Sequence, residues 1–478
     1  MFLNKKVGCD RKSSYAIIAM KSGKEEAFMR KKISLALATI SALCFCSCDG
    51  GLKDEPMGSN ATYDVLGTGE MPIGMWITPP DKWRNDEAFA NIAACGINLV
   101  NGFANNENTD EEVSFVLDAC QKYGLKYLYA STEIGEKIEE CKNSEDTARK
   151  TELIQETLAQ IDKFASHPAY AGQLFKDEPS LSYFDALADF MEAYRAKYTG
   201  KLPYVNMFPN FALAATGCSR YEDYVDKWID RANPVMYSYD DYPLLDYDPA
   251  KSGYETEMAG YYHNLDLLRV KTLEQGIPFW SFIATLSITR STTSNEPDGR
   301  APSREDVRWT VFSNLAFGVK GIQYFTYYTS SNQERHGNAM VDRSGNFTET
   351  YYNVKEVNTE FKNYDEILLN ADAVGVMFKD ERRGGFDIYS TPLTNFGGIR
   401  EVQGNKYLIG CFSDKDTGKK SVLITPTTPR DDIELSLKMH KSVKEVTVYI
   451  GGEKQIVKVN NQTLNLKIRH GDAVFMQL

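Results

Sequence analysis

The sequence contains few of the residues on which many enzyme mechanisms depend. Its 478 residues include only five histidines and nine cysteines, and no histidine stands beside a plausible nucleophile or in a metal-ligand spacing. A Gly-x-Ser-x-Gly elbow, a phosphate-binding glycine loop and a dinucleotide fingerprint are absent as well. These absences argue against acyl transfer by a histidine-dependent triad, nucleotide chemistry and zinc hydrolysis. They predict no metal and no cofactor.

Positive charge is scarce too. The chain has 54 basic and 66 acidic residues, a formal net charge of −12. Such a protein is a poor partner for nucleic acid or for an anionic membrane surface, whereas a neutral sugar or a cationic substrate fits. Tyrosine is abundant, with 28 residues, and aromatic rings at strand ends suit stacking on sugars. The composition therefore favours a carbohydrate substrate.

The N-terminal segment predicts export. A basic region begins at Met29, residues 33–45 are mostly apolar, and the segment closes on Cys48. It resembles a bacterial lipoprotein signal in which Cys48 becomes lipidated, with Met29 as the true start. We expect residues 1–48 to be this signal and residues 49–70 a tether, similar to those of Bacteroidetes lipoproteins. The protein would then be secreted across the inner membrane and held by its lipid on the outer membrane, on the periplasmic or the cell-surface side.

Residues 71–375 repeat one rhythm, in which a short apolar run is followed by a polar loop and an amphipathic helix. This count and length are typical of an α/β fold of the (β/α)8 TIM-barrel type. The expected strands are Ile73–Ile77, Asn98–Phe103, Lys126–Ala130, Gln173–Phe175, Tyr204–Met207, Val235–Tyr239, Phe279–Ala284 and Gly321–Tyr327. The expected helices are Asp86–Ala94, Glu111–Tyr123, Ala148–Phe164, Tyr183–Tyr198, Tyr221–Asp230, Tyr261–Glu274 and Arg304–Phe317.

Residues 376–478 follow a different pattern. Helical periodicity gives way to short alternating runs separated by turn signals such as Gly451-Gly452 and Asn460-Asn461. This pattern predicts a C-terminal antiparallel β-sandwich behind the barrel. The expected strands include Tyr407–Phe412, Ser421–Thr425, Ile433–Leu437, Val446–Ile450 and a last strand near the C-terminus.

The most informative stretch is Tyr170-Ala-Gly-Gln-Leu-Phe-Lys-Asp-Glu-Pro179. Pro179 cannot donate to a sheet ladder, so the fourth strand should end at or before Glu178. That places Glu178 at the carboxyl end of a barrel strand, where such barrels build their sites, and a carboxyl group held there is suited to general acid catalysis. The alternative is that Glu178 caps the following helix.

Polar and aromatic side chains stand at other strand ends. Amides, hydroxyls and aromatic rings that converge on one face of a barrel form the inventory of a sugar-binding site. The predicted substrate-binding residues are Trp76, Asn101, Asp177, Asn206, Tyr237, Tyr239, Trp280, Arg290 and Tyr327.

The order of elements, with Asp177-Glu178-Pro179 after the fourth strand, resembles clan A glycoside hydrolases. The segment from Arg308 to Phe325 is similar to the last helix and strand of family 42-type β-galactosidase-like barrels. The resemblance implies that Glu178 is the acid/base. Asp177 stands where the family usually has an asparagine that binds the 2-hydroxyl of the sugar.

The seventh strand departs from this family, which places its nucleophilic glutamate there. Residues 277–286 contain no carboxylate. Because both retaining and inverting mechanisms need two carboxyl groups, the second must come from elsewhere. Asp240 and Asp241 after the sixth strand are the first choice, Glu296 is the second and Glu133 the third. Tyr237 or Tyr239 could act as nucleophile instead, as tyrosine does in sialidases, with Arg290 holding an acidic sugar.

Two functions fit these residues. The first is a glycoside hydrolase acting on an oligo- or polysaccharide, with Glu178 as general acid/base and a second carboxylate from the loop after the sixth or seventh strand. The alternative is a non-catalytic surface glycan-binding protein on a barrel that has lost its catalytic pair. The separation between Glu178 and the nearest carboxyl group distinguishes them.

Overall fold

The computed structural model describes residues 63–102, 107, 109–244, 254–288, 301–329, 336–381 and 387–478. The predicted signal, its start at Met29, the lipidated Cys48 and most of the tether lie outside these ranges. No helix in the part of the chain that the structure describes combines the length and the apolar character that a membrane span requires.

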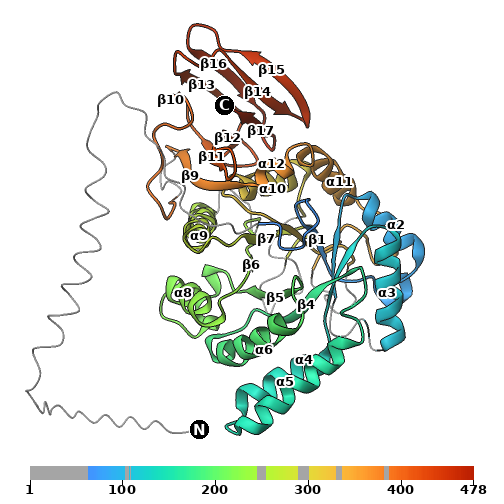
Figure 1. Cartoon of the computed structure of the whole chain (residues 1–478). Helices are drawn as coiled ribbons and strands as arrows, with labels where there is room; N and C mark the ends of the chain where they lie inside the picture. The colour runs from blue at the N-terminus through green and yellow to red at the C-terminus, as the bar shows by residue number, and fades with distance from the viewer. Residues whose placement is uncertain are drawn as a thin grey trace, which may run out of the picture. The chain divides into compact units, whose positions relative to one another are not determined.

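A closed barrel of parallel strands in sequential order forms the first part of the fold (Figure 1). The last strand pairs with the first, with Ile73 opposite Ile322 and Trp76 opposite Phe325, and this pairing closes the barrel. The predicted (β/α)8 barrel is confirmed. Its strands are β1 Ile73–Trp76, β2 Leu99–Asn101, β3 Lys126–Tyr129, β4 Tyr170–Asp177, β5 Leu202–Met207, β6 Tyr237–Asp240, β7 Phe279–Ala284 and β8 Ile322–Phe325.

Helices surround these strands, and two of them begin with a capping box. Thr109 and Glu112 form a capping box at the start of α3, and Ser303 and Asp306 form one at the start of α10. The helices are α2 Asp86–Ala94, α3 Asp110–Lys122, α4 Thr132–Asn143, α5 Thr147–Asp162, α6 Phe184–Lys197, α7 Leu213–Thr216, α8 Tyr221–Ala232, α9 Tyr254–Gln275, α10 Arg304–Ala316, α11 Glu349–Phe361 and α12 Asp365–Leu369. Short 3-10 turns are η1 Asp81–Trp83, η2 Leu181–Tyr183 and η3 Asn210–Ala212.

The helices α4, α7, α11 and α12 were not expected from the sequence. In α4 only Ile134, Ile138 and Cys141 are buried, so the apolar signal is a thin stripe in a polar segment. The helix α11 is rich in tyrosine, asparagine, threonine and valine, which have low helix propensity. In α4 and α11, tertiary packing therefore outweighs a weak local helix propensity.

The barrel interior is filled by side chains that alternate along the strands. At the amino-terminal ends the filling is apolar and includes Leu99, Leu202, Tyr204 and Trp280. Space is tight one layer higher, because a Cβ at Gly74 would lie 2.0 Å from Oε1 of Gln323. The interior is therefore a packed core, and an accessible site has to lie at the carboxyl ends of the strands.

The C-terminal part consists of two antiparallel sheets, one of six strands in the order β15-β14-β17-β12-β11-β9 and one of three in the order β10-β13-β16. Apolar residues such as Ile409, Val422, Leu437 and Val448 form a core of their own. The predicted β-sandwich is confirmed. The strands are β9 Ala371–Lys379, β10 Ile399–Gln403, β11 Tyr407–Asp414, β12 Lys420–Pro426, β13 Ile433–Met439, β14 Glu445–Ile450, β15 Glu453–Lys458, β16 Thr463–Ile468 and β17 Val474–Gln477.

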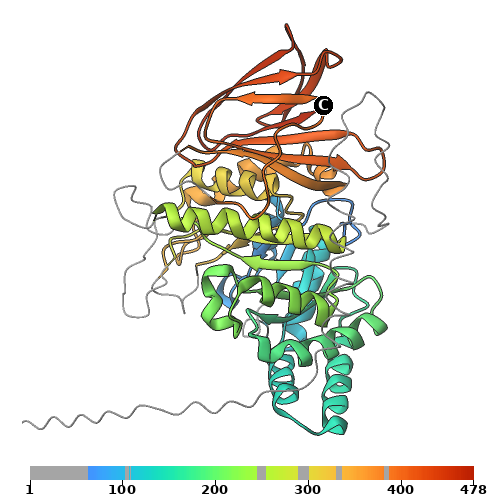
Figure 2. The ribbon, with the colours of Figure 1, turned by 90° about the vertical axis from the view of Figure 1, so that its left-hand side faces the viewer.

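The six-stranded sheet packs against the barrel helices α9 and α10 (Figure 2). The hydroxyl of Tyr262 on α9 donates to the carbonyl of Thr427 at 2.8 Å. A Cβ at Gly410 in β11 would lie 2.0 Å from the carbonyl oxygen of Ala316, so only glycine allows β11 to approach the end of α10 this closely. The strand β9 begins at Ala371, five residues before the expected domain boundary at residue 376.

Candidate active site

The end of β4 is shaped by a register shift. Between Leu174 and Lys176 the pairing of β4 with β5 slips by one residue. Phe175 packs outward on Tyr194 of α6, with ring centroids 5.5 Å apart. After the shift Asp177 is paired with Asn206 of β5, on the inner side of the barrel wall. The irregularity therefore re-aims the Asp177 carboxyl group toward the barrel mouth, as bulges near active sites often do.

Glu178 follows in a left-handed backbone conformation, with φ of 47°. For a residue other than glycine this conformation costs about 1–3 kcal/mol and persists only where the surroundings hold it. Here the N–H of Glu178 donates to the carbonyl of Asn206 at 2.8 Å, and the carbonyl of Pro179 accepts from the hydroxyl of Tyr224 at 2.6 Å. The side chain of Glu178 is half-buried. A strained backbone at a strand end marks Glu178 as a functional candidate.

Asn206, near the end of β5, joins two carboxyl groups. Its Nδ2 donates to Oδ1 of Asp177 at 3.1 Å and to Oδ1 of Asp240 at 2.9 Å. Its Oδ1 accepts from Oγ of Ser238 at 3.0 Å, and that Oγ lies 2.7 Å from the hydroxyl of Tyr204. Hydroxyl groups deeper in the barrel thus fix the orientation of the Asn206 amide, and its Nδ2 donates to both carboxyl groups.

The electrostatics of Asp177, Glu178 and Asp240 follow from their proximity, and we name these three the carboxyl cluster. Burial, and then the charge of Asp177, raise the pKa of Glu178 to about 7. Burial, then the charges of Glu178 and Asp177, raise the pKa of Asp240 well above its usual range, against the hydrogen bond from Asn206. Burial also raises the pKa of Asp177. Burial and the neighbouring negative charges both disfavour ionisation, so Glu178 holds a proton up to about pH 7.

The cluster remains open to solvent and is bordered by aromatic rings. The Asp177 side chain keeps solvent-accessible surface, although its carboxyl group is surrounded by protein atoms at the barrel mouth, and Asp240 is half-buried. Burial, and then the charge of Asp240, raise the pKa of Tyr242, which places this tyrosine beside the cluster; its ring packs 5.5 Å from that of Phe325. Tyr242 was not among the predicted site residues. The sequence pattern that could have identified Tyr242 is the two-residue alternation of a strand. Ser238, Asp240 and Tyr242 are two residues apart and so lie on the same side of the chain.

The same parity corrects the prediction for Tyr237 and Tyr239. Both have no exposed surface and point away from the barrel axis, toward Tyr221 on α8 and Tyr261 on α9 respectively. Asp241, which is 4% exposed, acts electrostatically on Tyr239 and Tyr261 and so lies on this outer side as well. The structure places Asp240, and not Asp241, in the carboxyl cluster.

Three further predicted binding residues are buried in the core, which corrects their assignment. Trp280 is the second residue of β7 and packs with Tyr204, with ring centroids 6.0 Å apart. Asn101 donates to the carbonyl of Met75 and to Oε1 of Gln323 inside the barrel. Tyr327 packs on the rings of Tyr328 and Tyr351. All three are 0% exposed and so have no surface for a ligand.

The remaining predicted residues are distributed as follows. Trp76 ends β1 and packs edge-on against Phe282, with ring centroids 5.7 Å apart. Glu133 lies on the exposed side of α4 and pairs with Lys137 at 3.9 Å, so it is not part of the carboxyl cluster. Arg290 and Glu296 lie outside the described residues.

The strand β7 contains no carboxylate, in keeping with its sequence. Phe282 stands opposite Asp240 in the pairing of β6 with β7. Besides Asp177, its neighbour in the chain, the carboxyl group that interacts electrostatically with Glu178 is that of Asp240 on β6. Within the described ranges, no group of three or more histidine, cysteine, aspartate or glutamate side chains is arranged to hold a metal ion.

Comparisons with known proteins extend the sequence resemblance. The model of the β-galactosidases of glycoside hydrolase family 42 matches residues 173–364, a range that includes the whole carboxyl cluster. A search of curated protein sequences finds no match.

Solved structures share the fold at low identity. An α-amylase from Anoxybacillus is 10% identical, with a TM-score of 0.51 over 86% of this chain and 98% of that one. A family 5 glycoside hydrolase from Bacteroides vulgatus is 11% identical, with a TM-score of 0.50 over 85% and 89%. A β-galactosidase from the psychrophilic Marinomonas ef1 is 12% identical, with a TM-score of 0.47 over 64% of this chain and 62% of its own length. The family model thus bears out the resemblance to family 42 β-galactosidases over residues 173–364, and the solved structures with TM-scores of 0.51 and 0.50 show the shared barrel fold.

Proposed function

We propose that this protein hydrolyses O-glycosidic bonds and that Glu178 and Asp240 are its two catalytic carboxyl groups. The observation that carries the proposal is the carboxyl cluster at the ends of β4 and β6. A strained, half-buried glutamate with a pKa raised to about 7 stands beside a second carboxyl group of raised pKa at the barrel mouth. Groups of this kind are expected where acid and base chemistry runs near neutral pH.

In the proposed reaction Glu178 donates its proton to the glycosidic oxygen as the bond from that oxygen to the anomeric carbon breaks. Asp240, as a carboxylate, either attacks the anomeric carbon or removes a proton from the attacking water. Water supplies the oxygen of the new hemiacetal, and its second proton restores the acid form of the pair. Asn206 donates to Asp240 and steadies its charged form.

The substrate class follows from the charge of the site. Three carboxyl groups near one another repel an anionic sugar, so a neutral glycoside within an oligo- or polysaccharide is favoured. Tyr242 lies beside the cluster and Trp76 ends β1 at the same face of the barrel, and we propose that these two rings contact the sugar.

The experiment is a screen of the protein from residue 49 onward against aryl glycosides and plant or host glycans. We expect hydrolysis of at least one neutral glycoside, and a loss of about 10²–10⁴-fold in turnover on replacing Glu178 with Gln. NMR of the first-formed anomer assigns Asp240 as nucleophile if configuration is retained and as base if it is inverted. A Glu178→Gln protein as active as the wild type would sink the proposal, and glycan binding without hydrolysis would favour a binding protein instead.

The cellular location is proposed from the sequence alone. Export and lipid anchoring at Cys48 would place the barrel outside the inner membrane, where polysaccharide substrates are met. Radiolabelled palmitate should be incorporated into the wild-type protein and not into a Cys48→Ala variant. Equal labelling of both proteins would exclude Cys48 as the anchor.

A further inference from the structure

A second hollow lies on the outside of the barrel, where α10 and α11 meet the β-sandwich. Its volume is about 570 Å³, within the range of small-molecule sites. The helix α10 contributes Arg304 and Arg308, and the sandwich contributes the turn at Ile450 and the loop at Asp472. Helices and turns line it, and no barrel strand does, so it is separate from the carboxyl cluster.

One face of α11 forms the long wall of this hollow, which we name the junction pocket. Tyr352, Lys355, Glu356 and Thr359 recur at helical spacing along that face, and Asn363 follows just past the end of the helix. Such spacing brings an aromatic ring, an amide, a hydroxyl and charged groups into one row.

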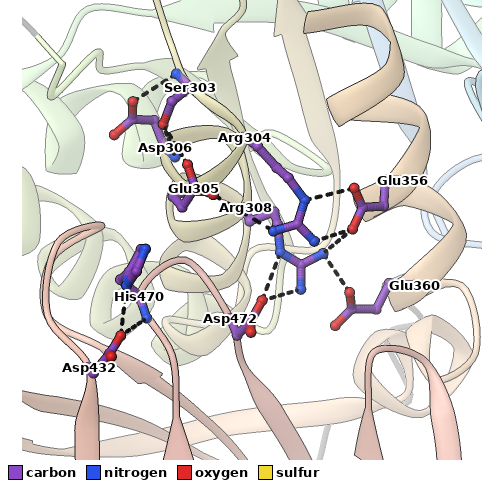
Figure 3. Close-up of polar contacts among 10 residues, drawn as sticks. All are labelled: Ser303, Arg304, Glu305, Asp306, Arg308, Glu356, Glu360, Asp432, His470 and Asp472. Atoms are coloured by element: carbon purple, nitrogen blue, oxygen red, sulfur yellow. Dashed lines mark hydrogen bonds and ion pairs between the residues drawn. The ribbon is translucent and has the colours of Figure 1, made fainter. Parts of the chain in front are cut away.

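The charged groups of the junction pocket hold one another in place (Figure 3). Arg308, whose side chain is 2% exposed, lies 2.6 Å from Glu360 and 3.0 Å from Asp472. Arg304 makes a two-pronged contact with Glu356, with Nε donating to Oε2 at 2.9 Å. These planar groups are thus fixed in orientation while carboxylate oxygens retain further lone pairs for hydroxyl donors.

The charges of the junction pocket also balance. Three cationic side chains face three carboxylates, so neither an anionic nor a cationic ligand gains from the net field. Hydrogen-bonding capacity without net charge suits a ligand rich in hydroxyl groups. The six side chains are Arg304, Arg308, Lys355, Glu356, Glu360 and Asp472.

An exposed aromatic cluster borders the pocket. Tyr352 is 58% exposed and Phe347 is 38% exposed, although rings of this size are usually covered. Phe347 stacks on Tyr351 with ring centroids 4.1 Å apart, and Tyr351 meets Tyr352 edge-on at 5.3 Å. Tyr352 is therefore a supported ring that presents its surface to solvent at the rim of a polar hollow.

We propose that the junction pocket is a second carbohydrate-binding site, which takes a neutral oligosaccharide chain with one sugar ring stacked on Tyr352. The apolar face of a pyranose matches the tyrosine ring, and its hydroxyls match Glu356, Asn363 and the other fixed polar groups. The site has no acid and base pair of its own and serves to hold a polymer while the barrel mouth acts elsewhere on it. It stands independently of the catalytic roles proposed for Glu178 and Asp240.

The test is native affinity electrophoresis of the protein from residue 49 onward in gels containing galactan, galactomannan, arabinoxylan or starch. We expect at least one of these neutral polysaccharides to retard the wild type and Tyr352→Ala to lose about tenfold in affinity, as expected for a lost stacking contact. Tyr352→Phe keeps the ring and should retain binding. The matched control is Tyr389→Ala, which removes another exposed tyrosine, 39% exposed, that packs on His263 outside the pocket.

Two results would overturn the assignment of the junction pocket. One is that none of the four neutral polysaccharides retards the wild type. The other is that Tyr352→Ala is retarded as strongly as the wild type. Near-ultraviolet circular dichroism of each variant shows whether it has folded. Because electrophoresis measures binding and not turnover, it tests the junction pocket even if the protein hydrolyses no glycoside.

Discussion

Asp240 accepts a hydrogen bond from Asn206, with 2.9 Å between Oδ1 and Nδ2, and this contact couples the ends of β5 and β6. The same nitrogen donates to Asp177 at 3.1 Å. The acceptor oxygens of Asp177 and Asp240 therefore lie no farther apart than the sum of these distances, roughly 6 Å, which is close enough for each carboxyl group to disfavour ionisation of the other. A single neutral amide thus brings together carboxyl groups from β4 and β6, with no contribution from β7.

The role of Glu178 as proton donor predicts a dependence on the leaving group. Glu178→Gln should lower kcat/KM by about 10²–10⁴-fold on an alkyl glycoside, whose leaving oxygen needs a proton. On a 2,4-dinitrophenyl glycoside, whose leaving group departs as an anion, the loss should be far smaller. Steady-state kinetics on the two substrates measure the difference.

Asp177→Asn is the matched control for that experiment. It removes one charge from the same cluster and restores the asparagine found in the resembled family, so both substrates should be hydrolysed at rates near the wild type. Equal losses on the two substrates in Glu178→Gln would contradict a proton-donor role.

The pH dependence of activity should follow the same group. Because the pKa of Glu178 is raised to about 7, its acid form predominates below that pH, and kcat/KM should fall as pH rises through about 7. Asp240 must be ionised, and its raised pKa should move the acid limb above the ordinary aspartate range. These limbs belong to the coupled pair. In Glu178→Gln the alkaline limb should disappear for the activated substrate, and its persistence at the same pH would assign it to another group.

Adjacent aspartates after β6 provide a direct test of the second carboxyl group. Asp240→Asn should lose at least about 10²-fold in kcat/KM on both the alkyl and the dinitrophenyl glycoside, since leaving-group acidity cannot replace a nucleophile or base. Asp241→Asn alters a buried group on the outer side of the chain and should retain most activity. A larger loss in Asp241→Asn than in Asp240→Asn would reverse the assignment.

Most of the barrel was predictable because its signals are local. Apolar runs such as Phe279–Ala284 end at polar loops, and the observed β7 has the same bounds. The helix α2, with its asparagine cap at Asn85, also matches its expected range. Periodicity and capping reside in neighbouring residues, so one sequence suffices to read them.

The site was less predictable because side-chain direction depends on register. The register of β4 against β5 shifts between Leu174 and Lys176, and this shift turns Asp177 inward. No residue type in either strand predicts the shift. In β6 the direction was available from period-two alternation, which puts Ser238 and Asp240 on one side and Tyr237 and Tyr239 on the other. Residue type alone predicted Tyr237 and Tyr239 as sugar ligands, but their positions in the strand point both side chains away from the barrel axis.

Arg308 should be the most costly of the charged residues to remove at the contact between barrel and sandwich. It is 2% exposed and pairs with Glu360, which is 6% exposed, at 2.6 Å. Arg308→Met leaves the Glu360 carboxylate buried without its partner and should lower the free energy of unfolding by about 3–5 kcal/mol. The double variant Arg308→Met/Glu360→Leu should recover most of this loss, because the buried carboxylate is gone and the other partner, Asp472, is 36% exposed and can be hydrated.

Thermal and urea denaturation with a surface control measure this difference. Arg231→Met breaks ion pairs with Asp185 and Asp189, but Arg231 is 38% exposed, so its removal should cost less than about 1 kcal/mol. Burial already raises the pKa of Glu360, and Arg308 opposes that rise. Without Arg308 the pKa rises further, so the folded state binds a proton more readily than the unfolded state. The penalty of Arg308→Met should therefore shrink as the pH falls toward 5, and a penalty constant from pH 8 to pH 5 would show that lost packing, and not the buried charge, is its cause.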